Sequence, residues 1–276
     1  MNLTSKRDIV DLLDKYDAKP LKALGQNFLI NENYVKKIAA FSSKDDTVVE
    51  VGPGLGTLTK ELAIRSKRII AIEKDRKMIE ILKETLKDFK NVSIIEGDIL
   101  DLVDDLNLND SNYKVIANLP YYISPAIIRK FLEAKNPPSE MIVTLQKEVA
   151  QRICSKPPRM SILSVSVQIY TSPKILFKIA RNSFWPVPNV DSAVLKIEKK
   201  KDLPDIDFNS FFQIVKAGFS RPRAQLLNNL SKQLKLSKDD LKELILKVDV
   251  QPSQRAETLS ISDWLKLEEI LRNSNA

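Results

Sequence analysis

Residues 47–66 read TVVEVGPGLGTLTKELAIRS, and this stretch decides the fold. Its first six residues form a β-rich run typical of a buried strand, and its last ten are typical of a helix. Where the strand leads into the helix the chain places Gly52, Gly54 and Gly56, three of only 6 glycines in the sequence. A glycine-rich turn between strand and helix lets main-chain amides approach a ligand at the carboxyl end of a sheet.

The same alternation continues along the chain. Strands are predicted at RIIAIEKD, NVSIIEGD and YKVIANLP, and helices at RKMIEILKETLKD and SPAIIRKFLEA; residues 139–153 begin as a strand and turn helical. This order predicts an α/β fold with a Rossmann-like, doubly wound parallel sheet and right-handed crossovers.

The last third of the chain changes character. SILSVSVQIY (161–170) and AVLKIEKK (193–200) are expected to be strands, and KKKDLPDID (199–207) a linker. Only helical patterns follow, at 208–218, 223–234, 237–248 and 260–272, with two expected capping boxes, Ser237 with Asp240 and Ser260 with Asp263. The predicted domains are therefore residues 1–201 and a smaller, all-helical domain at 202–276.

Composition excludes several kinds of chemistry. The chain has 276 residues, one cysteine (Cys154) and no histidine. These counts exclude an internal disulfide, His-dependent nucleophilic catalysis and the usual zinc sites, so no metal site is expected and a cofactor is expected to bring the reactive group. There is no apolar run of the about 20 residues that span a bilayer, and the N-terminus lacks a signal-peptide pattern. The protein is expected to be cytoplasmic, without membrane contact.

The net charge of +8 is concentrated in one stretch. Residues 141–200 hold 10 basic and 3 acidic side chains, whereas residues 1–140 hold 22 of each. A solvated basic face would explain this pattern, and so would a surface that binds a polyanion through clustered Lys and Arg.

The glycine turn carries a first indication of the ligand. Dinucleotide enzymes use G-x-G-x-x-G, but here the spacing is G-x-G-x-G with Glu50 just upstream, which disfavours an oxidoreductase. A carboxylate at this place suits a positively charged amino or sulfonium group, as in S-adenosylmethionine. Glu73 and Asp98 end the next two strands, where they are expected to complete an adenosine pocket.

The fourth strand ends in Asn118-Leu119-Pro120-Tyr121, an unusual way to leave a core. Asn118 offers a carbonyl oxygen to an exocyclic amine, and the carbonyl before Pro120 can accept its second hydrogen. Tyr121 offers a ring face on which a planar base can stack. A proline-terminated strand with a core tyrosine is the alternative. Tyr122 is expected to pack.

At this point six motifs establish a resemblance. LGQNFLI (24–30), EVGPGLGTLT, AIEKD, EGDIL, NLPYYIS and FWPVPNVDSAV (184–194) occur in the order typical of ribosomal RNA adenine N6-methyltransferases. The chain resembles the small-subunit (16S) rRNA adenine N6,N6-dimethyltransferase family, the KsgA type, along nearly its full length. The resemblance implies an S-adenosylmethionine-dependent enzyme, and the protein is expected to be a monomer. It would dimethylate two adjacent adenines in the 3′-terminal helix loop of 16S rRNA within a small-subunit precursor.

The resemblance also assigns roles to residues. For the cofactor, the resemblance implies that Asn27 and Leu29 close over the ligand and that Gly52 and Gly54 lie at its methionine part. It further implies that Glu73 binds the ribose and Asp98 the adenine, and that Asn118 lies beside the cofactor. Toward the target it implies Asn118, Leu119 and Pro120 holding N6, and Tyr121 with Phe184 sandwiching the extruded base.

Two departures concern regions expected to face RNA. Pro222 and Ala224 replace basic residues of the family pattern, and SKPPRMSILSV lacks an expected Tyr-Gly pair. Two alternatives stay open: an Erm-type 23S rRNA adenine methyltransferase, and a non-catalytic RNA-binding assembly factor. The intact NLPY motif weighs against the second.

Overall fold

The computed structural model describes residues 1–21, 24–106, 108 and 112–274, which fall into two compact units. The first unit comprises residues 1–150 and 173–199, and the second comprises residues 151–172 and 200–276. Across the described residues, no helix is long and apolar enough to cross a membrane.

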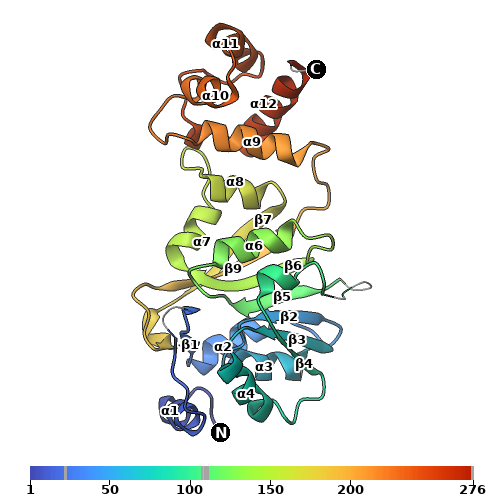
Figure 1. The fold of residues 1–276 in the computed structure, drawn as a ribbon, viewed down its shortest axis with the longest axis vertical. Coiled ribbons are helices and arrows are strands. Elements are labelled where there is room, and N and C mark those ends of the chain that lie inside the picture. Colours follow the sequence, from blue (N-terminus) through green and yellow to red (C-terminus); the bar gives the residue numbers. More distant parts are fainter. Residues whose placement is uncertain (22–23, 107, 109–111, 275–276) are drawn as a thin grey trace. The chain divides into compact units, whose positions relative to one another are not determined.

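A seven-stranded sheet organises the first unit, with the order β4-β3-β2-β5-β6-β9-β7 (Figure 1). Strands β4, β3, β2, β5 and β6 run parallel, and β9 pairs antiparallel with β6. The strands span β2 Thr47–Val51, β3 Arg68–Glu73, β4 Val92–Glu96, β5 Lys114–Asn118, β6 Glu140–Gln146, β7 Thr171–Ile179 and β9 Ser192–Lys199. The predicted Rossmann-like sheet is confirmed.

Helices alternate with these strands as the sequence predicts. They span α1 Lys6–Lys15, α2 Glu32–Ala39, α3 Thr57–Arg65, α4 Arg76–Thr85, α5 Ile99–Leu102, α6 Ser124–Leu132 and α7 Lys147–Ile153. The apolar sides of α2 and α3 pack over strand residues such as Val48, Ile69 and Ile116 in one buried cluster. A second cluster joins α1 to α4 through residues such as Leu12 and Met78. Apolar burial on the sheet thus supplies the main favourable free energy of this unit.

The strand order reverses between β2 and β5, because β2 lies between β3 and β5. In open α/β sheets, ligands bind beyond the carboxyl ends of the strands at such a reversal. The glycine turn follows β2 and the NLPYY segment follows β5, so two motifs far apart in the sequence meet at this place.

A short two-stranded sheet joins two further motifs. Strand β1 (Phe28–Leu29) lies in LGQNFLI and pairs antiparallel with β8 (Phe184–Trp185) of FWPVP. A backbone hydrogen bond from Ile30 to Ser183, at 2.9 Å, extends this pairing toward the 3₁₀ turn Arg181–Ser183. No pattern in the sequence predicted it, since each strand has only two residues.

The strand predicted at residues 161–170 is wrong. The expected strand is instead helix α8 (Ile162–Gln168). Alternating apolar residues and serines match the period of a strand, but Ser161 and Ser164 form a reciprocal capping box that begins a helix. Residues 151–172 belong to the second unit, whereas the predicted boundary placed them with the sheet.

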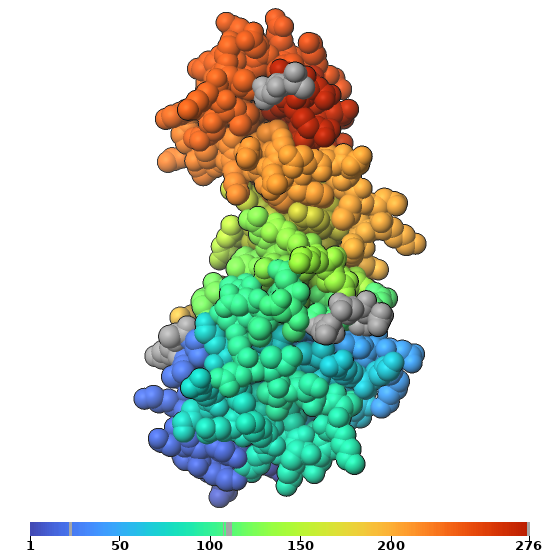
Figure 2. Space-filling model, turned by 45° about the vertical axis from the view of Figure 1, so that its right-hand side comes forward, coloured from blue at the N-terminus to red at the C-terminus, as the bar shows by residue number. Residues whose placement is uncertain are grey.

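The rest of the second unit is helical, as predicted: α9 Phe208–Gly218, α10 Leu226–Leu234, α11 Lys238–Lys247, the 3₁₀ turn Ala256–Thr258 and α12 Ile261–Ser274. In the space-filling view of Figure 2 the atoms of this part, orange to red, gather into one body. Ser260 and Asp263 form the expected capping box, with backbone-to-side-chain hydrogen bonds of 2.8 and 3.2 Å. The expected box at Ser237 is wrong, because its side chain makes no capping hydrogen bond.

Candidate active site

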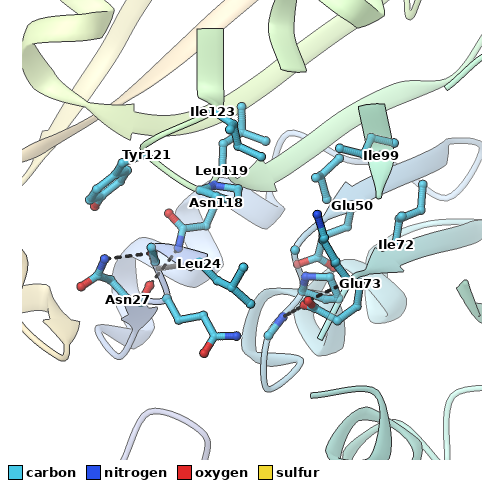
Figure 3. A pocket seen from close by; sticks show the side chains of 18 of the residues that line it. Leu24, Asn27, Glu50, Ile72, Glu73, Ile99, Asn118, Leu119, Tyr121 and Ile123 are labelled. Atoms are coloured by element: carbon cyan, nitrogen blue, oxygen red, sulfur yellow. Dashed lines mark hydrogen bonds between the residues drawn. The ribbon is translucent and has the colours of Figure 1, made fainter. Parts of the chain in front are cut away.

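A pocket lies at the reversal point and contains most of the predicted site residues. It encloses about 1020 Å³ of space free of atoms, its open mouth included. The motifs that line it are Leu24–Leu29, Glu50–Gly54, Ile72–Lys74, Gly97–Ile99 and Asn118–Ile123. In Figure 3, Asn27, Asn118 and Tyr121 lie on one side of the pocket, and Glu50, Glu73 and Ile72 on the other.

The glycine turn is shaped by close approaches that a side chain would prevent. Gly54 has φ +58°, and a Cβ atom there would lie 3.0 Å from Cε1 of Phe28. Gly52 has φ +65° and faces Pro120, whose Cγ would lie 3.7 Å from such a Cβ. These positive φ values suit glycine. The turn therefore runs directly beneath both the LGQNFLI loop and the NLPYY segment.

Glu73 is a buried carboxylate that the backbone holds in place. Its Oε2 accepts a hydrogen bond from the Gly54 amide at 3.1 Å, and its Oε1 accepts from Lys74 and Asp75 at 2.9 and 3.0 Å. Burial raises the pKa of Glu73, and the three backbone donors offset part of that rise. The residue thus fixes the glycine turn to the end of β3, and its remaining lone pairs can accept from hydroxyl groups.

Glu50 is even more buried, with 2% of its surface exposed. Within the described part of the chain, its Oε2 has no hydrogen-bond partner. Burial raises the pKa of Glu50 to about 8, and the charge of Glu73 adds to the rise. A buried carboxyl without a partner is costly unless a ligand supplies a donor or a positive charge.

Asp98 is the third carboxylate of the pocket, after Glu50 and Glu73, and it follows strand β4. Its Oδ1 caps α5 by accepting from the Leu100 amide at 3.0 Å, and its Oδ2 pairs with Nζ of Lys74 at 2.7 Å. The ammonium of Lys74 holds the pKa of Asp98 below its usual range. Sequence reasoning missed Lys74, because a lysine after a strand carries no signal of its own.

Asn118 faces the pocket from the end of β5, and the two polar atoms of its side-chain amide differ in their hydrogen bonding. Its Nδ2 donates to the backbone carbonyl of Asn27 at 3.1 Å, which turns Oδ1 away from the loop. Oδ1 is buried and, among the described residues, has no hydrogen-bond partner. Leaving such an acceptor unpaired costs about 1–3 kcal/mol, so the site is ready to accept from a donor on a ligand. Asn27 in turn donates from its own side chain to the Gly25 carbonyl at 3.0 Å.

Tyr121 and Tyr122 follow Pro120 but have different environments. The Tyr121 hydroxyl hydrogen-bonds to Oγ of Ser192 at 2.6 Å, and burial raises the pKa of this phenol. Tyr122 was expected to pack, but 55% of it is exposed at the pocket.

Phe184 is the predicted site residue that the structure places elsewhere. It is fully buried in the cluster that contains Leu29 and Val35, and it is not among the residues that line the pocket. The β1–β8 pairing sets Phe184 opposite Leu29 and Trp185 opposite Phe28, whose rings stack at 6.4 Å. Because side chains alternate along a strand, pairing directs Phe184 into the core. Phe184 is thus buried and does not line the pocket, and its expected place beside Tyr121 stays a prediction.

The sequence model of the family described as ribosomal RNA adenine dimethylase matches residues 19–273. The chain belongs to this family. A relative from Dehalococcoides mccartyi strain CBDB1, named ribosomal RNA small subunit methyltransferase A, is 42% identical over 262 residues, covering 93% of this chain and 90% of its own.

Two solved structures of related enzymes have similar folds. A dimethyladenosine transferase from Plasmodium falciparum has a TM-score of 0.75 at 25% identity, covering 90% of this chain and 98% of its own. The 23S rRNA methyltransferase ErmE has a TM-score of 0.70 at 25% identity, covering 89% of this chain and 100% of its own. One of these structures is thus named for 23S rRNA, and the identity is higher to the relative named for the small subunit.

Proposed function

We propose that this chain transfers methyl groups from S-adenosylmethionine to N6 of two adjacent adenines in the 3′-terminal helix loop of 16S rRNA. The substrate would be a small-subunit precursor, and the enzyme would act as a monomer in the cytoplasm. The unpartnered Oδ1 of Asn118, buried at the reversal point of the sheet, carries this proposal. An exocyclic amine is a donor from which such an oxygen can accept.

The pocket residues fit the proposed cofactor. The unpartnered Oε2 of Glu50 suits the positively charged methionine end, beside the amides of the glycine turn. Glu73 has lone pairs for ribose hydroxyls, and Asp98 has lone pairs for the adenine amino group. Asn27 and Leu29 line the same pocket from the loop above. When bound, the cofactor supplies an electrophilic methyl group.

The remaining steps belong to the NLPY segment. Asn118 Oδ1 accepts one hydrogen of the target amine, and the Leu119 carbonyl accepts the other, while Pro120 keeps that carbonyl rigid. Two acceptors on the two hydrogens direct the nitrogen lone pair toward the cofactor. Tyr121, held by Ser192, presents its ring to the extruded base. No histidine base is needed, because the amine loses its proton after it has become cationic.

We assign rRNA docking to exposed basic residues outside the pocket. Within the described residues, no ion pair involves the exposed cations Arg152, Lys156, Arg159, Lys174, Lys178 and Arg181, which leaves their charge for phosphates. They come from the basic stretch of the sequence.

The helical part of the second unit, residues 202–276, adds a basic hollow with about 600 Å³ of space free of atoms, its open mouth included. Arg221, Lys232 and Lys238 line it together with Ala224, Asn228 and Ser231. Arg221 is held by Oδ1 of Asn229 at 3.2 Å and by the Asn228 carbonyl at 3.1 Å. These cations supply charge where Pro222 and Ala224 depart from the family pattern, which supports docking by this domain.

The test offers methyl-labelled S-adenosylmethionine to unmethylated small- and large-subunit particles and maps the modified base. Two dimethylated neighbouring adenines in 16S rRNA are expected, and the Asn118→Ala variant is the control for contaminating activity. Label in 23S rRNA would favour the Erm-type alternative. Absence of transfer to both particles would favour the non-catalytic assembly factor.

A further inference from the structure

Tyr122 is a large aromatic side chain that the pocket leaves open to solvent. It lies 55% exposed at the pocket, in a turn where Tyr121 and Pro120 have partners within the protein. Exposing this much aromatic surface forgoes the gain that burial would give. The exposed ring therefore stands where a ligand could cover it.

The neighbours of Tyr122 place it at one end of the pocket. A Cβ atom on Gly25 would lie 3.4 Å from Cδ1 and 3.8 Å from Cε1 of the Tyr122 ring, so one edge of the ring rests on the loop. Gly25 has φ +63°, which suits glycine, and its lack of a side chain lets the ring approach.

The carboxylate end of the pocket lies within electrostatic reach of Tyr122. The pKa of Lys74 is raised mainly by its hydrogen bond to Asp98, and Tyr122 makes a smaller contribution to this rise. Lys74 pairs with Asp98 at 2.7 Å, and Asp98, Ile99 and Tyr122 line the same pocket.

This position separates the two tyrosines by role. The Tyr121 hydroxyl is tied to Ser192 at the start of β9, whereas the Tyr122 ring rests on Gly25. Asp98 offers an acceptor, Ile99 offers an apolar surface and Tyr122 offers a ring. An acceptor, an aliphatic surface and an aromatic ring together suit a planar base that carries an amino group.

We propose that the ring of Tyr122 covers the adenosine half of the cofactor and, with Leu24 and Gly25, closes that end of the pocket. This inference rests on the proposed use of S-adenosylmethionine. Consecutive residues then serve different ligands: Tyr121 contacts the target base, and Tyr122 contacts the cofactor base. Tyr122 determines how tightly the cofactor and its demethylated product are held.

The test measures binding of S-adenosylmethionine and S-adenosylhomocysteine to the full-length protein by calorimetry, without RNA. Three variants are compared with the wild type: Tyr122→Phe, Tyr122→Leu and Tyr122→Ala. Ile64→Ala is the matched control, because Ile64 is 52% exposed on α3 and lies outside the pocket lining. Thermal unfolding checks that each variant is folded.

We expect Tyr122→Ala to raise both dissociation constants about tenfold, the loss of one stacking contact. Tyr122→Leu should lose nearly as much, since it retains apolar volume against Gly25 but no planar face. Tyr122→Phe and Ile64→Ala should stay within about twofold of the wild type.

Two results would overturn the inference. If Tyr122→Leu binds like the wild type, packing against Gly25 suffices and the ring does not stack. If Tyr122→Ala keeps its cofactor affinity but raises the KM for the rRNA substrate, the ring belongs to the target base. Failure of the wild type to bind either ligand would instead overturn the proposed function, and this inference with it.

Discussion

The two sides of the pocket satisfy their polar groups differently. On the carboxylate side, Glu73 accepts three backbone hydrogen bonds, and Asp98 is held by Lys74 and the Leu100 amide. On the amide side, Asn118 has a partner for its nitrogen and none among the described residues for its oxygen. Apart from Oε2 of Glu50, which has no partner among the described residues, the carboxylates of the first side are held within the protein. The second side has an acceptor left for a ligand.

Removing that acceptor should have the largest effect. We expect Asn118→Ala to reduce kcat at least about 100-fold, as when a single catalytic hydrogen-bonding group is lost. Cofactor affinity should change little, which calorimetry on the same preparation would show. Methyl transfer at the wild-type rate would mean that the amine is held elsewhere.

Removing a carboxylate from the carboxylate side should weaken binding of S-adenosylmethionine. Glu73→Ala removes the acceptor for the Gly54 amide as well as the proposed ribose contact, so we expect a rise of about 10- to 100-fold in the dissociation constant of S-adenosylmethionine. Glu73→Gln retains one acceptor oxygen and should lose less. Equal affinities for both variants and the wild type would exclude Glu73 from the cofactor site.

Glu50 provides a pH test of the same side. Because its folded-state pKa is raised to about 8 from 4.5, its contribution to stability is fully present below pH 4.5 and is lost as pH rises toward 8. Between these values the free energy of unfolding should fall by up to about 1.4 kcal/mol per pH unit on account of this residue. Glu50→Gln should remove that slope, measured by urea unfolding at pH 6, 7 and 8. An unchanged slope would mean that other groups control it.

The smallest expected effect concerns the basic hollow. Lys232→Ala should weaken binding of 16S rRNA about threefold at moderate salt and reduce the slope of log affinity against log salt by about 1. Lys242→Ala is the matched control, since Lys242 is exposed on α11 but lies outside the hollow. Equal slopes for both variants would argue against phosphate binding there.

The position of a site residue could be predicted from the sequence where that residue ends or directly follows a strand of the sheet. Glu73, Asp98 and Asn118 were predicted to meet because parallel strands end at one edge, and they line one pocket. Sequence patterns did not suffice where tertiary pairing decides. The burial of Phe184 depends on a two-residue strand that no sequence pattern indicates, and its assignment to the target base stays a prediction. The serine-rich strand pattern at 161–170 was overridden by a capping box.

The solvent exposure of the two tyrosines could not be predicted from the sequence either. Nothing in NLPYY distinguishes Tyr121, which Ser192 holds, from Tyr122, which remains open. Likewise, the unpartnered oxygens of Glu50 and Asn118 depend on which donors come within reach, and those donors lie on other strands and loops.

The contact between Asn118 and the carbonyl of residue 27 has a consequence for tolerance to mutation. A main-chain acceptor is present whatever side chain the residue carries, so substitution at position 27 leaves this particular hydrogen bond possible. A change of loop length does not, because removing or adding one residue between Gly25 and Phe28 shifts the carbonyl by roughly 3.5 Å along the chain. The hydrogen bond of the Asn118 amide is thus sensitive to insertions and deletions in a segment 91 residues away in the sequence. It depends little on which side chains that segment carries.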